Sequence, residues 1–88
     1  MNNARRKEIT GIVEKLASLA SLIEELTAAA EDIRDSEQDY FDNMPEGLQG
    51  GEKGTMAEEA VSNLDDAISA LGDFDVDGII STLESASE

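Results

Sequence analysis

The apolar residues of the N-terminal half follow the spacing of one long helix. From Ile9 they recur at alternating three- and four-residue steps, the a/d pattern of a helix that packs along a seam. The pattern comprises Ile9, Ile12, Leu16, Leu19, Ile23, Leu26, Ala30 and Ile33, and extends to Tyr40 and Met44 with an interruption at Glu37. A residue before proline is disfavoured in a helix, so Met44-Pro45 predicts the end. We expect a helix over about residues 4–43, a length typical of coiled coils.

The remaining sequence predicts a loop and two shorter helices. Residues 45–54 contain the single Pro and four of the seven Gly, which indicates a loop. Thr55 and Glu58 match a capping box, and the single apolar face that follows predicts a helix over about 56–71. Asp75 is placed to cap a third helix over about 76–86. The sequence therefore predicts one all-α domain, 1–88, with a long N-terminal helix in an antiparallel helical hairpin and a short third helix, forming a coiled-coil-like bundle.

The predicted first helix has more apolar surface than the two shorter helices can cover. A lone helical hairpin leaves the outer side of its Leu/Ile stripe in contact with water. We therefore expect a homodimer, in which either two hairpins form a four-helix bundle or two copies of the first helix pair. The residues expected to form the dimer seam are Ile12, Leu16, Leu19, Ile23 and Leu26.

The charge is strongly acidic and unevenly distributed. The chain has 21 Asp and Glu against 6 Lys and Arg, a net charge of −15 without His. Residues 16–88 contain only two cations, Arg34 and Lys53. Self-repulsion of this size exceeds what solubility requires, and it argues against direct binding to nucleic acid or anionic lipid. Three explanations stay open: a basic partner surface, cations gathered by the carboxylates, or neutral drift on a robust helical scaffold.

Composition argues against catalysis and against a membrane location. Without His or Cys, the groups for acid–base chemistry are carboxylates, Lys and Tyr. Carboxylates that align on a helix, such as Asp35 and Asp39, fall on a face expected to be solvated. No run approaches the ~18 apolar residues of a membrane span, and we do not expect the start of the chain to be a signal peptide, because an amphipathic stretch follows Arg5-Arg6-Lys7. We expect a non-enzymatic, cytoplasmic protein.

One segment matches a calcium-binding motif. Residues 73–84, DFDVDGIISTLE, fit the EF-hand loop D-x-[DN]-x-[DN]-G-x5-E. The oxygen ligands would come from Asp73, Asp75, Asp77, the carbonyl of Ile79, and Glu84. Only four residues follow Glu84, too few for the second helix of an EF-hand, and Phe74 and Val76 occupy positions that normally face water. We favour the alternative, in which Asp75 caps the third helix and the protein has no cofactor.

A second segment combines carboxylates with aromatic residues. It comprises Asp35, Asp39, Tyr40, Phe41, Asp42 and Glu46. Aromatic residues anchor protein interfaces, and the acids would meet Arg or Lys of a partner. Alternatively, Tyr40 and Phe41 pack the following loop onto the end of the first helix. The sequence leaves both interpretations open.

Several short motifs resemble a group of small, acidic, helical proteins encoded by tailed phages and prophages. They are Arg5-Arg6-Lys7, Glu37-Gln38, Asn43-Met44-Pro45-Glu46, Leu48-Gln49 and Glu59-Ala60-Val61. The resemblance implies a phage origin and the cytoplasm of a host bacterium, but no activity or functional residue. By analogy with other small acidic phage proteins, we expect docking on a basic, nucleic-acid-binding face of a host protein, as an inhibitor or nucleic-acid mimic of the anti-defence type. The alternative function is a structural or scaffolding helical dimer.

Overall fold

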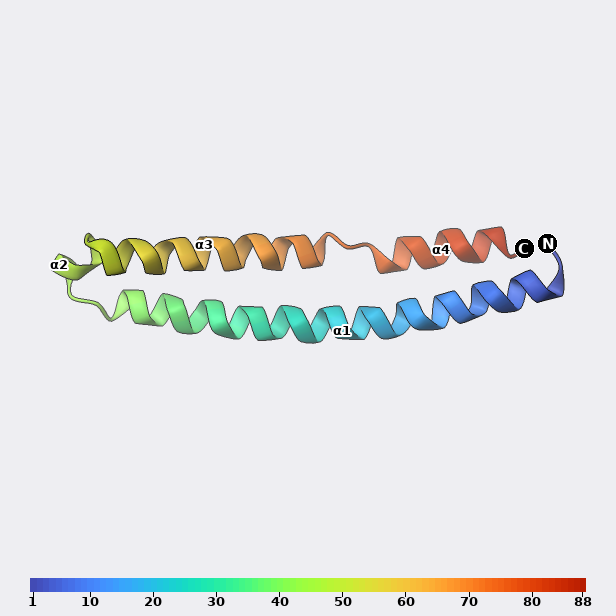
Figure 1. The fold of residues 1–88 in the computed structure, drawn as a ribbon, viewed down its shortest axis with the longest axis horizontal. Coiled ribbons are helices and arrows are strands. Elements are labelled where there is room, and N and C mark those ends of the chain that lie inside the picture. Colours follow the sequence, from blue (N-terminus) through green and yellow to red (C-terminus); the bar gives the residue numbers. More distant parts are fainter. The chain divides into compact units, whose positions relative to one another are not determined.

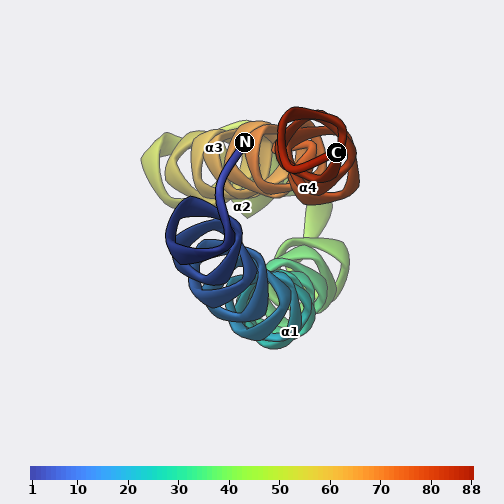
Figure 2. The same ribbon diagram turned by 90° about the vertical axis from the view of Figure 1, so that its right-hand side faces the viewer.

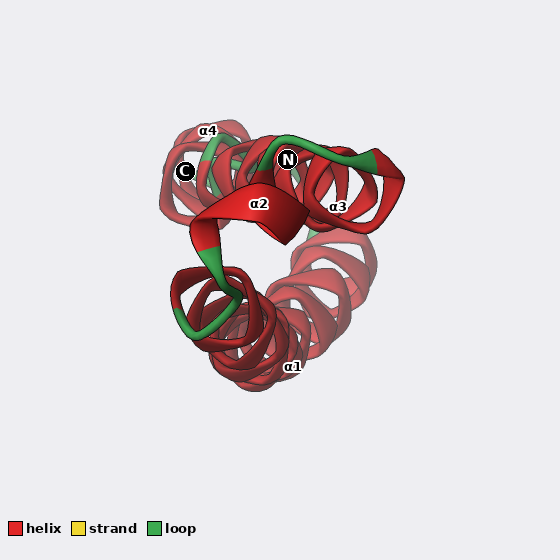
Figure 3. Cartoon of the chain, turned by 90° about the vertical axis from the view of Figure 1, so that its left-hand side faces the viewer, coloured by secondary structure: helices red, strands yellow, loops and turns green.

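The structure, a computed structural model that describes residues 1–88, is built from helices and short connections, with no strand (Figure 3). The elements are α1 (Asn3–Asp42), α2 (Glu46–Gln49), α3 (Glu52–Gly72) and α4 (Val76–Ala86). The predicted all-helical fold with a long first helix is confirmed.

Helix α1 is continuous over 40 residues. At its start, the Asn2 side chain accepts a hydrogen bond from the backbone N–H of Arg5 at 2.8 Å, which satisfies one of the donors that every helix start leaves unpaired. The helix ends at Asp42, just before Met44-Pro45, as the proline predicts. Gly11 lies inside the helix without interrupting it.

The segment predicted as a loop is largely helical. It holds α2, and α3 begins at Glu52 rather than at about residue 56. The predicted capping box is wrong, because the Thr55 hydroxyl donates to the carbonyl of Gly51 at 3.1 Å instead of accepting from a backbone N–H. The physical reason lies at Gly54, where a Cβ would overlap the backbone of Gln49. Glycine therefore lets the first turn of α3 pack directly on the end of α2.

The chain divides into two compact units, and α1 contributes to both. In the first unit, Met1–Glu25 and Phe74–Glu88, the start of α1 lies beside α4 (Figures 1 and 2). There the Arg6 Nε donates to the carbonyl of Ser87 at 2.9 Å. In the second unit, Leu26–Asp73, the rest of α1 lies beside α3. Gln49 Nε2 ties α2 to α1 by donating to the carbonyl of Phe41 at 3.0 Å.

The buried core of the chain is small. Only Ala57 and Val76 are buried apolar residues, and no large side chain is fully buried. Burying a Leu, Ile or Phe side chain completely contributes about 1.5–3 kcal/mol. The many Leu and Ile residues of this chain therefore give only part of the stabilisation that they can give.

Helix α4 begins where the sequence predicts, with Asp75 as its N-cap. The Asp75 carboxylate accepts the backbone N–H of Gly78 at 2.9 Å. We expect Asp75→Ala to lower the free energy of unfolding by about 1 kcal/mol, because that donor loses its partner. Circular dichroism during thermal unfolding measures the change. Asp75→Asn keeps an acceptor and should restore most of the stability, whereas equal loss in both variants would contradict the capping role.

Candidate protein-binding surface

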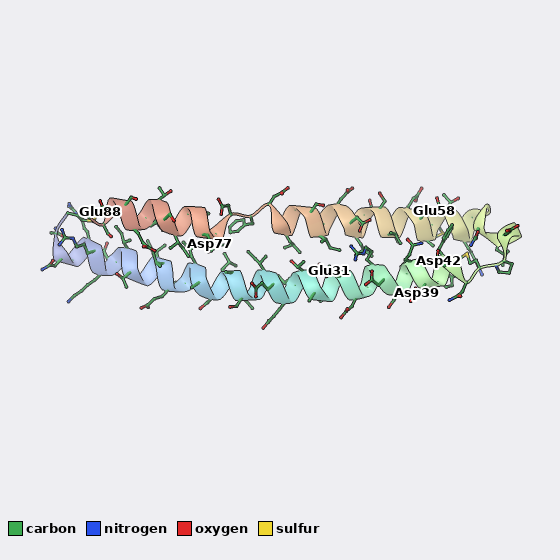
Figure 4. The ribbon with its side chains drawn as sticks, turned by 180° about the vertical axis from the view of Figure 1, so that it is seen from behind. Glu31, Asp39, Asp42, Glu58, Asp77 and Glu88 are labelled. Atoms are coloured by element: carbon green, nitrogen blue, oxygen red, sulfur yellow. The ribbon has the colours of Figure 1, made fainter.

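The carboxylates of this protein lie almost entirely on its surface. All 21 acidic residues are exposed except Glu31 and Glu37, which are half-buried. The six labelled in Figure 4 belong to α1, α3, α4 and the C-terminal residue. Ion pairs involve one cation only, Arg34, with Asp35 at 3.0 Å and Asp65 at 3.1 Å. Most of the negative charge is therefore exposed without a cation of the same chain beside it.

Arg34 is the cation that joins α1 to α3. Its Nη1 donates to Asp65, and its Nε and Nη2 donate to Asp35, the next residue on α1. The hydrogen bond to Asp65 raises the pKa of Arg34 above its usual value, and the hydrogen bond to Asp35 adds to this rise. A raised folded-state pKa favours the folded chain at every pH below the unfolded value. Arg34 therefore stays charged, and its contribution does not vary over the neutral range.

Three of the predicted binding residues form a row, which we call the carboxylate row: Asp35, Asp39 and Asp42. Spacings of four and three residues place them on one side of α1, and all three are exposed. The Asp42 carboxylate accepts from Gln38 Nε2 at 2.9 Å. Glu46 is also exposed, in the first turn of α2. The row presents acceptor oxygens, of which Asp35 Oδ1 already accepts from Arg34 and Asp42 Oδ1 accepts from Gln38.

The two predicted aromatic anchors do not share a surface. Tyr40 is 51% exposed, whereas Phe41 is half-buried and its carbonyl receives the Gln49 side chain. Phe41 thus belongs to the contact between α1 and α2, as the packing interpretation expects. Tyr40 lies about 100° around the helix from Asp39, because consecutive helical residues differ by that angle.

Sequence inspection missed a depression beside Tyr40. This shallow hollow of about 370 Å³ is lined by Tyr40, Asn43, Met44, Pro45, Leu48 and Lys53. Leu48 is 54% exposed. A large apolar residue inside a Gly-rich segment was the one sequence signal for it. The hollow offers apolar contacts beside one of the few cations of the chain.

The residues of the calcium motif are not assembled into a loop. Asp73 follows the end of α3 and Asp75 caps α4, while Asp77, Ile79 and Glu84 lie within α4. Residues 76–84 are helical in this structure and do not form the second part of a twelve-residue binding loop. No group of three or more acidic side chains in the structure is placed to hold a metal ion.

The residues of the predicted dimer seam differ in how far they are exposed. Leu16, Leu19 and Ile23 are half-buried. Ile12 and Leu26 are 48% and 56% exposed. One apolar pattern in the sequence therefore corresponds to a partly covered side and an open side of α1.

Two further findings bear on what the protein is. No helix of the structure combines the length and the hydropathy that crossing a bilayer requires. In comparisons with known proteins, no protein family, no curated protein and no solved structure matches this chain.

Proposed function

We propose that this protein is a non-enzymatic acidic binding protein of phage origin, which acts in the cytoplasm of a host bacterium. It binds a basic, nucleic-acid-binding surface of a host protein, as an inhibitor or nucleic-acid mimic. The proposal rests on one observation. Nearly all carboxylates are exposed, and only one cation, Arg34, is paired with any of them. Phage origin and host location rest on the sequence resemblance.

The carboxylate row is the part of the surface that best fits such a partner. At a rise of 1.5 Å per residue, its members follow one another at roughly 4.5–6 Å along α1. Arg and Lys side chains that bind phosphates also bind carboxylates, and Arg does so with two parallel hydrogen bonds. A groove that attracts a nucleic-acid backbone would attract this row through the same long-range field. We further propose that α1, α3 and α4 form an antiparallel, coiled-coil-like helical hairpin that holds the row straight.

Affinity capture with the full chain tests the proposal. The immobilised protein should retain a basic protein from bacterial lysate at about 0.05 M salt and release it at about 0.5 M, because salt screens exposed charges. Duplex DNA should release the same protein, and mass spectrometry should identify it as nucleic-acid-binding. Asp39→Lys with Asp42→Lys should abolish capture while leaving the helical circular dichroism signal unchanged.

A matched pair of substitutions controls for the overall charge. Glu58→Lys with Glu59→Lys makes the same charge change at exposed positions of α3, and this variant should still capture the partner. Capture that survives high salt and excess DNA would contradict the mimicry. Equal loss in the two variants would show that no particular face is used.

The alternative function, a structural or scaffolding dimer, is favoured by a different observation. Large apolar residues of α1, including Leu26 and Ile33, are more than half exposed. Contiguous exposed apolar surface marks protein–protein contacts. Failure of any partner to appear in the capture experiment would favour this alternative.

A further inference from the structure

An exposed apolar stripe runs along α1. We call it the outer stripe: Ile12, Leu19, Leu26, Ile33 and Tyr40, which follow one another at intervals of seven residues. Four of the five are between 48% and 59% exposed, and Leu19 is half-buried. Leu22, one helical turn from Leu19, is 52% exposed. A coiled coil uses two apolar positions in each heptad, and the outer stripe supplies one of them, while Leu22 and Ala29 supply the second near its centre.

Most of the outer stripe lies away from the α1 side chains that are hydrogen-bonded to other parts of the chain, although Tyr40 also lines the hollow beside Leu48 and Lys53. Arg6 and Arg34 make the hydrogen bonds from α1 side chains to Ser87 and to Asp65 of α3. Arg34 follows the stripe residue Ile33 by one position, and Arg6 follows Arg5, which lies seven residues before Ile12. Each arginine therefore lies about 100° around α1 from the neighbouring part of the stripe. Because the stripe follows a single helix, its geometry depends on α1 alone.

The charge along α1 indicates what covers the stripe. Near its start α1 carries the cations Arg5, Arg6, Lys7 and Lys15. Residues 31–46 carry seven acids and a single cation, Arg34. A parallel copy of the helix would bring the two acidic ends together, and an acidic partner of any kind would be repelled. A second copy in antiparallel orientation places the basic start of each helix beside the acidic end of the other, which is the complementary arrangement.

We propose that the outer stripe binds the outer stripe of a second copy of this chain, in antiparallel orientation, with Leu26 at the two-fold axis. An isologous interface requires that if residue i contacts residue j, then j contacts i. Leu26 then meets Leu26 of the other copy, Leu19 meets Ile33, and Ile12 meets Tyr40. In the same register Lys15 lies at the same level along the paired helices as Glu37. Around α1, Asp39 lies about 100° from the stripe, and Asp35 and Asp42 lie about 160° from it. The carboxylate row therefore stays open in the paired form. This pairing does not depend on the proposed function.

Single cysteines test the register, because the natural chain has no Cys. A short bis-maleimide should link Leu26→Cys to itself as a dimer on a denaturing gel. Ile12→Cys and Tyr40→Cys should link poorly when each is alone, and efficiently when the two variants are mixed. Mass spectrometry should identify the 12–40 link in the mixture. Ala28→Cys is the matched control: Ala28 is exposed and lies about 160° from Leu26, so it should not link.

Sedimentation equilibrium tests the association without cross-linking. The wild-type chain should sediment at twice its mass of 9.4 kDa at micromolar concentration. Leu26→Asp places two carboxylates on the axis and should weaken the association roughly 100-fold, whereas Ala28→Asp should leave it unchanged. A wild-type monomer at these concentrations would overturn the proposal. So would self-linking of Ile12→Cys as efficient as the 12–40 link, because it indicates a parallel pair.

Discussion

Gly54→Ala should destabilise this protein by about 1–3 kcal/mol, although it adds a single methyl group to a helix. The reason is the contact between α2 and α3, where a Cβ on Gly54 would overlap backbone atoms of Gln49. Backbone cannot move aside as the end of a flexible side chain can, so α3 must shift or lose its first turn. Urea unfolding followed by circular dichroism measures the loss.

Gly11→Ala is the matched control for this prediction. Gly11 also lies in a helix, but a Cβ there meets nothing within 4 Å. This substitution should raise stability by about 0.5–1 kcal/mol, because alanine loses less backbone freedom than glycine on folding. Equal stabilisation of both variants would contradict the close approach of α2 and α3 at Gly54.

Added salt should raise the melting temperature of this protein by a few degrees. Along α1, four like-charge pairs lie three or four residues apart: Glu31/Asp35, Asp32/Asp35, Asp35/Asp39 and Asp39/Asp42. Each such pair destabilises a helix by roughly 0.2–0.5 kcal/mol, so together they cost about 1–2 kcal/mol, and a change of about 1 kcal/mol moves the melting temperature of a domain of this size by about 4–8 °C. Three attractive pairs at the same spacings, Arg5/Glu8, Glu31/Arg34 and Arg34/Glu37, and the ion pairs of Arg34 with Asp35 and Asp65 offset part of this cost. The long-range repulsion of a net charge of −15 adds to it. Thermal unfolding at about 0.01 and 0.5 M salt provides the measurement.

Two double variants separate local repulsion from total charge. Asp35→Asn with Asp39→Asn removes all four pairs, so this variant should melt higher at low salt and respond less to added salt. Glu58→Gln with Glu59→Gln removes the same charge from α3, where neither residue has an acid three or four positions away. Its response should stay close to that of the wild type. A melting temperature that falls with added salt would show that repulsion between the carboxylates does not outweigh the attractive pairs.

Features that depend on neighbouring residues in the chain were predictable. The end of α1 was indicated by Pro45, and the start of α4 by Asp75, because a missing N–H and a capping carboxylate act within one helical turn. The carboxylate row was predictable for the same reason, since the spacing of Asp35, Asp39 and Asp42 fixes their common side once α1 is helical. The start of α3 was not predictable, because it depends on the contact between Gly54 and Gln49 across a turn.

The sequence by itself determined that α1 is one long helix with a heptad of apolar residues, since that follows from spacing and helix propensity. It did not determine which apolar positions face the rest of the chain. Leu16 and Ile23 share their half-buried side with Val13 and Ala20, whereas Leu26 and Ile33 stay exposed. The apolar residues of α1 cover more of the helix circumference than contact with one neighbouring helix requires. The heptad pattern is therefore compatible with either side of α1 facing the rest of the chain. Only the tertiary structure, through contacts such as the one between Arg34 and Asp65 across 31 residues, decided which side faces inward.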